Sequence, residues 1–213
     1  MNKWINTVRS YLQAFQHLLY PHICLQCGID TLRENQIICD VCETQLPFTH
    51  FEKMEINPIE KIFWGRAHIA NAIAIVFFTK DSIVQQIIVE LKYKHNKKAG
   101  YLLGRLIANE LINNLKYSQV DYLIPIPISK RKMKKRGFNQ SLIICESILA
   151  SGFKAAVFTG LLKNKEATTQ TQKDRMERAR ENNALFSLTQ VSLLTGKHLL
   201  IIDDVVTLSL IHI

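Results

Sequence analysis

Apolar positions along the chain alternate between two patterns. Runs rich in β-branched residues predict buried strands, and apolar residues three or four positions apart predict helices. The expected strands cover 69–79, 121–127 and 197–206. The expected helices cover 1–19, 82–92, 99–115 and 139–150. Because strands that alternate with helices form βαβ crossovers, we expect an α/β fold with a largely parallel sheet.

Composition divides the chain into four segments. We expect an N-terminal helix in 1–20, a small cysteine-rich module in 21–47, a connector in 48–64 and the α/β domain in 65–213. Within this last domain, 164–183 is polar, charged and rich in Gln and Thr, which is typical of a mobile surface segment.

The chain of 213 residues carries a formal net charge of +9, which suits a polyanionic partner such as nucleic acid or a phosphorylated small molecule. Its longest uncharged apolar stretch, 69–79, is shorter than the ~20 residues that a membrane-spanning helix needs. The N-terminal residues lack the continuous apolar core of a secretory signal. We therefore expect a cytoplasmic protein without a membrane span.

Four of the five cysteines form two C-x-x-C pairs separated by eleven residues, namely Cys24, Cys27, Cys39 and Cys42. Two such turns can place four thiolates about 2.3 Å from one zinc ion in a tetrahedron. Such a closed site is structural, because no position stays open for a substrate. Disulfides or a redox pair are the alternatives, but nothing suggests secretion and a redox C-x-x-C is normally single. Cys145 lies in an apolar helix and is expected in the core.

A strongly basic run follows the second expected strand, because six of the seven residues in 130–136 are Lys or Arg. Ligands of open α/β sheets bind outside the carboxyl ends of strands. We therefore predict that the loop holding this run binds pyrophosphate or the phosphates of DNA; a solvated lysine loop is the alternative. The residues expected at this site are Lys134, Lys135, Arg136, Gly137, Asn139 and Gln140. Gly137 would permit a tight turn, and Asn139 or Gln140 would cap the next helix.

Two adjacent acids, Asp203 and Asp204, end the apolar run 199–202. Burying two carboxylates without partners is costly, so an acid pair at a strand tip indicates a polar ligand. The pair could accept hydrogen bonds from the vicinal hydroxyls of a ribose, or hold Mg²⁺ through water. Lys92, Tyr93 and Lys94 could add to the face of the basic run 130–136, or could simply be a basic helix end favoured by the helix dipole.

The segment "LLIIDDVVT" resembles the phosphoribosyl pyrophosphate (PRPP) motif of type I phosphoribosyltransferases. Other segments, in the order in which they occur, extend the resemblance over nearly the whole chain to the ComF family of bacterial competence proteins. These segments are "CLQCG", "ICDVC", "LKYKHNKKAGYLLGRLIANEL", "DYLIPIPISKRKMKKRGFNQS" and "TTQTQKDRMERARENNALF".

The resemblance implies a type I phosphoribosyltransferase-like parallel sheet, preceded by a zinc ribbon in which the four paired cysteines hold structural zinc. Asp203 and Asp204 would face the ribose hydroxyls of PRPP, which binds with Mg²⁺, and Thr207 would open the loop for the 5′-phosphate. Residues 170–178 would match a flexible segment over the site. The family is associated with the uptake of transforming DNA, near a helicase-like translocase at the inner face of the cytoplasmic membrane.

Three functions are therefore compatible with the sequence. The first is a ComF-type protein that supports DNA uptake and carries a PRPP-type site. The second is a basic zinc-ribbon adaptor that binds single-stranded DNA, or another competence protein, without catalysis. The third is an active amidophosphoribosyltransferase-like enzyme, although no residue is a convincing general base for its acceptor.

Two departures from the family pattern concern the C-terminal third. Arg178 is followed by "ARENNALF" where the family usually has an Asn-Val pair. No glycine follows Thr207, so the residues present cannot build a tight phosphate cradle. The last six residues, Leu208–Ile213, match the translated end of a transposase-based sequencing adapter. We expect that they are not native and that the C-terminal part of the fold is missing.

Overall fold

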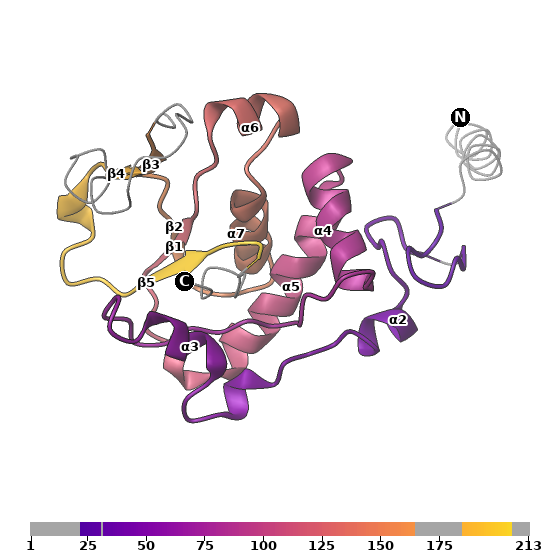
Figure 1. Ribbon diagram of the computed structural model, residues 1–213, viewed down its shortest axis with the longest axis horizontal. Helices are drawn as coiled ribbons and strands as arrows, with labels where there is room; N and C mark the ends of the chain where they lie inside the picture. Colours follow the sequence, from indigo (N-terminus) through magenta and orange to yellow (C-terminus); the bar gives the residue numbers. More distant parts are fainter. Residues whose placement is uncertain (1–21, 31, 165–184, 206–213) are drawn as a thin grey trace, which may run out of the picture.

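The computed structural model describes residues 22–30, 32–164 and 185–205 (Figure 1). It is a mixed α/β structure. The α-helices are α2 (Asp40–Thr44), α3 (Pro58–Phe63), α4 (Ile83–Tyr93), α5 (Lys97–Asn113), α6 (Lys130–Arg136) and α7 (Gln140–Ala150). Three short 3-10 helices are η1 (Phe51–Lys53), η2 (Leu115–Tyr117) and η3 (Val191–Leu193).

Three strands form a parallel sheet in the order β2-β1-β5. Their bounds are β1 (Tyr122–Pro125), β2 (Ala156–Val157) and β5 (Leu199–Ile202). Tyr122 pairs with Leu199 and Pro125 with Ile202, so β1 and β5 end at the same edge of the sheet. The parallel α/β architecture is thus confirmed, whereas its phosphoribosyltransferase-like topology stays a prediction.

A second, antiparallel sheet consists of β3 (Leu161–Lys163) and β4 (Phe186–Leu188). The apolar pattern did not predict these strands or β2. Each has only two or three residues, which is too short for alternation to be visible.

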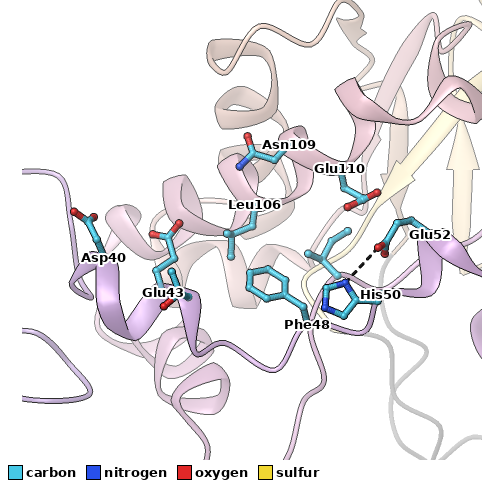
Figure 2. A pocket seen from close by; sticks show the side chains of 10 residues that line it. Asp40, Glu43, Phe48, His50, Glu52, Leu106, Asn109 and Glu110 are labelled. Carbon is cyan, nitrogen blue, oxygen red and sulfur yellow. Dashed lines mark hydrogen bonds and ion pairs between the residues drawn. The ribbon is translucent and has the colours of Figure 1, made fainter.

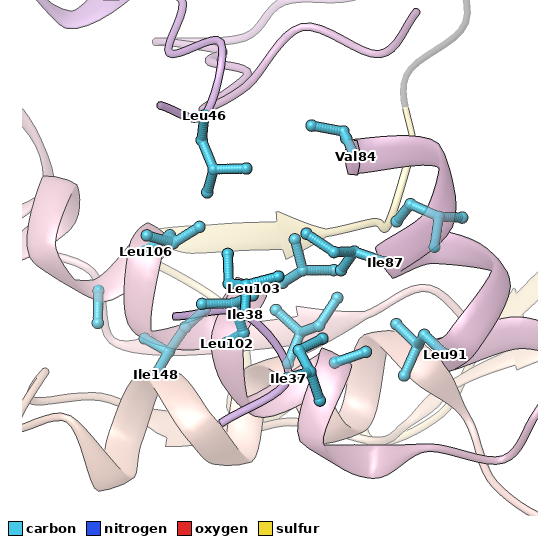
Figure 3. Close-up of a cluster of buried hydrophobic side chains, with 14 of the residues drawn as sticks. Ile37, Ile38, Leu46, Val84, Ile87, Leu91, Leu102, Leu103, Leu106 and Ile148 are labelled. Carbon is cyan, nitrogen blue, oxygen red and sulfur yellow. The ribbon is translucent and has the colours of Figure 1, made fainter. Parts of the chain in front are cut away.

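Helices α4, α5 and α7 pack around one hydrophobic core, which also receives side chains from the cysteine-rich segment (Figure 3). Ile38, from between the two cysteine pairs, is buried together with Leu102 of α5 and Ile148 of α7. The cysteine-rich segment therefore shares the core of the α/β part. The predicted domain boundaries stay predictions.

Close packing of α5 on α7 depends on two glycines one helical turn apart. A Cβ atom on Gly104 would lie 2.6 Å from the carbonyl oxygen of Ile144, and one on Gly100 would lie 2.6 Å from Cγ2 of Ile143. A hydrogen bond of 2.8 Å from Ser147 Oγ to the Tyr101 carbonyl joins the two helices at the same place. No larger residue fits here without moving a helix.

The strand predicted over 69–79 is wrong. The backbone of this segment pairs with residues 47–49 and not with β1 or β5. The contacts are an isolated bridge between Phe48 and Val76 and a hydrogen bond of 3.0 Å from the Thr49 N–H to the Ile75 carbonyl. Apolar composition alone could not distinguish these two outcomes.

The loop predicted for the basic run is also wrong, because residues 130–136 form helix α6. The remaining predictions agree with the structure to within a few residues at α4, α5, β1, α7 and β5. The predictions for 1–20, Thr207, Leu208–Ile213 and all but the first residue of 164–183 lie outside the described residues. Among the helices that are described, none is long and apolar enough to cross a membrane.

Candidate functional site

Helix α6 presents the basic run on the surface (Figure 1). Ser129 caps its start, since the Ser129 Oγ accepts the Lys132 N–H at 3.4 Å. Gly137 ends it in the left-handed conformation, with φ +73°, and donates its N–H to the Met133 carbonyl at 2.8 Å. Lys and Arg are good helix formers, so a capped basic run becomes a helix rather than a loop. None of its residues is buried.

The end of α4 holds the end of α6 in place. His95 Nδ1 donates a hydrogen bond of 2.8 Å to the Arg136 carbonyl. The exposed ring of Tyr93 has the Arg136 guanidinium at 5.7 Å and the Lys135 ammonium at 6.0 Å from its centroid. These are cation–π contacts between segments about forty residues apart in sequence. The sequence allowed 92–94 either to share a face with 130–136 or simply to end a helix. Tyr93 does lie against α6, whereas Lys92 pairs with Asp204 instead.

We call the exposed and half-buried cations at the end of α4, the start of α5 and in α6 the basic surface. It consists of Lys94, Lys97, Lys130, Arg131, Lys132, Lys134, Lys135 and Arg136. Lys94 pairs with Glu90 at 2.7 Å, and the Lys97 ammonium lies 5.6 Å from the ring centroid of Phe138. In the part of the chain that the structure describes, no ion pair joins any of the six α6 cations to a carboxylate. Their charge is therefore available to an external anion.

Asn139 and Gln140 lie beneath the basic surface rather than on it. Asn139 caps α7 by accepting the Ser141 N–H at 3.1 Å, and its Nδ2 donates to the Ile126 carbonyl at 3.0 Å. Gln140 is almost fully buried and accepts a hydrogen bond of 2.9 Å from Arg136. Both side chains hold the turn between α6 and α7, and their contact with a phosphate stays a prediction.

The acid pair lies at the carboxyl end of β5. The Asp204 carboxylate pairs with the Lys92 ammonium of α4 at 2.9 Å, and both side chains are largely buried, 12% and 18% exposed respectively. Asp203 is exposed, and its Oδ1 accepts the Asp204 N–H at 2.8 Å. Nearby protein atoms displace part of the water around the Asp203 carboxyl and raise its pKa, and the charge of Asp204 acts in the same direction.

The four paired cysteines form one cluster, with all four sulfur atoms within 4.8 Å of one another. Cys24 and Cys42 are buried, and no disulfide joins any pair. The Cys24 sulfur accepts the Cys39 N–H at 3.3 Å, and the Cys39 sulfur accepts the Cys42 N–H at 3.5 Å. Four thiols at this separation are the donor set of a structural zinc site. The residues present therefore fit zinc.

Two of these thiols have pKa values shifted in opposite directions. Burial raises the pKa of Cys24, but hydrogen bonds from backbone N–H groups, including that of Cys39, outweigh it and lower the pKa to about 6. Burial and the neighbouring thiols raise the pKa of Cys42 to about 12. Because zinc binds thiolates, metal binding would release the protons that remain on the cluster.

A pocket of about 350 Å³ lies between α2, η1 and α5 (Figure 2). Its charged lining is acidic, with His50 Nδ1 3.3 Å from Glu52 and with Glu43 bound by both terminal nitrogens of Arg105. Burial, and then the charge of Glu52, raises the pKa of Glu110. No sequence motif indicated this pocket, because its residues come from three separate segments.

Comparison with known proteins gives distant relatives that share one name. The chain is 27% identical to the DNA utilization protein YhgH of Shigella flexneri over 124 residues, which are 57% of this chain and 54% of that protein. It is 26% identical to the Escherichia coli K12 protein of the same name over the same length and shares, and 25% identical to that of Salmonella typhi over 121 residues, 55% of this chain and 52% of that protein.

The chain thus spans about half the length of the curated relatives that it matches. No family model matches it. No solved structure matches it significantly.

Proposed function

We propose that this protein takes part in the uptake or utilization of DNA and that the basic surface contacts the DNA backbone. The observation that carries the proposal is α6 itself, a surface helix with six cations that have no carboxylate partner among the described residues. Unpaired cations bind phosphates by releasing condensed counterions. The shared name of the relatives supports the same process.

Single-stranded DNA is the form that the surface suits best. Proteins that bind single strands without sequence preference combine a basic track with aromatic rings on which bases stack. Tyr93 provides such a ring, 58% exposed and directly beside Lys135 and Arg136. Zinc in the cysteine cluster would stabilise the fold without contacting the DNA.

The test is fluorescence anisotropy with a labelled oligothymidine of about 15 nucleotides, titrated at several salt concentrations between ~50 and ~200 mM. Replacing Lys134, Lys135 and Arg136 with Gln removes three phosphate contacts, so the slope of log affinity against log salt should flatten by about 2. The matched control replaces Lys53, Lys116 and Lys154, three exposed lysines outside the basic surface, with Gln.

Both triple variants lose the same net charge. If they weaken binding equally, the net charge of the protein drives binding and the basic surface is not the interface. If only the α6 variant loses affinity and slope, the proposal holds.

A second candidate function is a PRPP-type site at the acid pair, as the resemblance to phosphoribosyltransferases implies. One observation favours it. Because β1 and β5 are parallel, their carboxyl ends lie at the same edge of the sheet. The acid pair follows β5 at this edge, and the segment that leads to α6 follows β1 there. Asp203 and Asp204 would receive ribose hydroxyls, and α6 would lie toward the pyrophosphate. An amidophosphoribosyltransferase-like reaction with an unidentified acceptor is the catalytic version of this candidate.

Calorimetric titration of PRPP with Mg²⁺ tests this second candidate. Binding that the Asp203→Asn, Asp204→Asn double variant abolishes would support it. Equal heats in the two proteins would reject it. A helicase-like translocase as partner, at the inner face of the cytoplasmic membrane, is a further proposal that rests on the family resemblance alone.

A further inference from the structure

The Lys92–Asp204 ion pair joins two residues that no local motif connects. Lys92 lies in the last turn of α4, and Asp204 is the second residue after β5. The ammonium and carboxylate lie 2.9 Å apart with little of either side chain exposed. A charged group with so little exposure to solvent needs a partner of opposite charge. Removing either the ammonium or the carboxylate leaves the other charge buried and uncompensated. The pair is therefore part of the architecture of the acid-pair edge.

This ion pair changes the electrostatics of the edge. Two free carboxylates would carry a charge of −2 and offer oxygen ligands to a divalent cation. With the Lys92 ammonium against Asp204, the three groups together carry −1. The ammonium also repels a second cation placed near the Asp204 carboxylate. The residues present therefore do not fit direct ligation of Mg²⁺ by both acids.

Asp203 differs from Asp204 in each of these respects. Among the described residues it forms no ion pair, although its side chain interacts with that of Asp204. It is exposed, and its Oδ1 accepts the backbone N–H of Asp204. That hydrogen bond orients the carboxylate without neutralising it. Asp203 is thus the acid whose charge remains available to a hydroxyl donor.

We propose that Lys92 is a positioning residue that neutralises Asp204 and leaves Asp203 facing the ligand. The edge then accepts the vicinal hydroxyls of a sugar phosphate and does not ligate a divalent cation by itself. Any Mg²⁺ would arrive with the phosphates of the ligand. This inference rests on the second candidate function above, in which the acid pair receives a ribose.

The first arm of the test uses Mn²⁺ alone, without PRPP, and zinc-loaded protein so that the cysteines are occupied. Electron paramagnetic resonance measures the free Mn²⁺. We expect the wild type and Lys92→Arg to retain no Mn²⁺ at the acid pair. Lys92→Met should gain Mn²⁺ binding at the acid pair that the wild type lacks, because both carboxylates are then uncompensated. A Lys92→Met, Asp204→Asn double variant should lose that gain.

Wild-type Mn²⁺ binding that the Asp203→Asn, Asp204→Asn variant abolishes would overturn the proposal. This comparison does not require Lys92→Met to fold. Equal Mn²⁺ affinity in the wild type and a folded Lys92→Met variant would overturn it as well. Lys116→Met, which removes an exposed cation outside both the acid-pair edge and the basic surface, is the matched control and should behave like the wild type.

The second arm titrates PRPP with and without Mg²⁺. If the wild type binds no PRPP at all, the second candidate function fails, while the Mn²⁺ measurements still decide the role of Lys92. If PRPP binds, the Asp203→Asn variant should lose more affinity than Asp204→Asn, since only Asp203 faces the hydroxyls. The opposite order would contradict the assignment.

Discussion

The cysteine cluster and the basic surface are assembled in contrasting ways. Four sulfur atoms from one segment, 24–42, come within 4.8 Å of one another through two local turns. The basic surface instead joins the end of α4 to α6, and the acid pair beside the sheet joins α4 to the end of β5. A site made by local turns is visible in the residue spacing. A site made by distant segments depends on every packing contact between them.

The difference predicts which changes are destructive. A change at the cluster would remove a ligand of the zinc ion that the four cysteines fit, and would also reach the shared core through Ile37 and Ile38. A change at the basic surface removes charge from solvent-exposed side chains and should alter binding more than folding. The predictions below run from the largest expected effect to the smallest.

Removing zinc or one buried ligand should have the largest effect. Binding of structural zinc supplies on the order of 10 kcal/mol to small metal modules, and Cys24 is only 2% exposed. Cys24→Ser should therefore lose the metal and unfold at a much lower temperature, measured by zinc analysis and thermal denaturation. Cys145→Ala is the control, since this core thiol lies outside the cluster and its loss should leave zinc stoichiometry unchanged. A stoichiometric metal-free wild type would contradict the zinc assignment.

Gly104→Ala should disturb the packing of α5 on α7 without changing any residue of the basic surface or the acid pair. The new Cβ would lie 2.6 Å from the Ile144 carbonyl oxygen, so α5 and α7 must separate. Overpacking of this kind destabilises by about 1–3 kcal/mol, measurable by urea denaturation. Zinc content should remain at one per chain. Asn109→Ala, on an exposed position of the same helix, should change stability little, and an equal loss in both variants would refute the packing argument.

Tyr93→Ala should sharpen the assignment of the basic surface. Stacking of a base on an aromatic side chain contributes about 1–3 kcal/mol, so affinity for oligothymidine should fall at least about fivefold. The salt slope should stay constant, because no phosphate contact is removed. Tyr101→Ala, another exposed tyrosine, lies on α5 and should leave affinity unchanged. Equal losses of affinity in the two variants would mean that the DNA does not bind at the basic surface.

Replacing Asp121 should have the smallest effect on stability, and that effect should depend on pH. Its carboxylate accepts the His198 N–H at 2.9 Å and pairs with Lys197 at 3.0 Å, and these contacts lower its pKa. Since the pKa is lower in the folded protein, ionised Asp121 stabilises the start of β5 above its unfolded pKa of ~3.9. The contribution disappears as the pH falls through the folded value.

The stability difference between the wild type and Asp121→Asn should therefore be greatest near neutral pH and vanish in strong acid. Urea denaturation at a series of pH values measures it. A difference that stays constant from neutral to strongly acidic pH would mean that the charge of Asp121 contributes nothing.

Much of the fold could be predicted where periodicity was long. Helices α4 and α5 repeat their apolar positions over eleven or more residues, and α7 is apolar over most of its length. Their predicted ranges match the structure within a few residues. The pattern failed at 69–79, where apolar residues pair with the connector, and at α6, where capping by Ser129 and Gly137 favours a helix. Two-residue and three-residue strands carry too little pattern to be predicted at all.

The sequence by itself determined the features that depend on near neighbours. These are the doubled C-x-x-C spacing, the caps and periodicity of the longer helices, and the charge of the run 130–136. Only the tertiary structure decided that Lys92 reaches Asp204, that Tyr93 and His95 hold the end of α6, and that the cysteine segment shares the core of α5. The physical reason is that turns and helices form from local backbone geometry, whereas these contacts exist only after distant elements have packed.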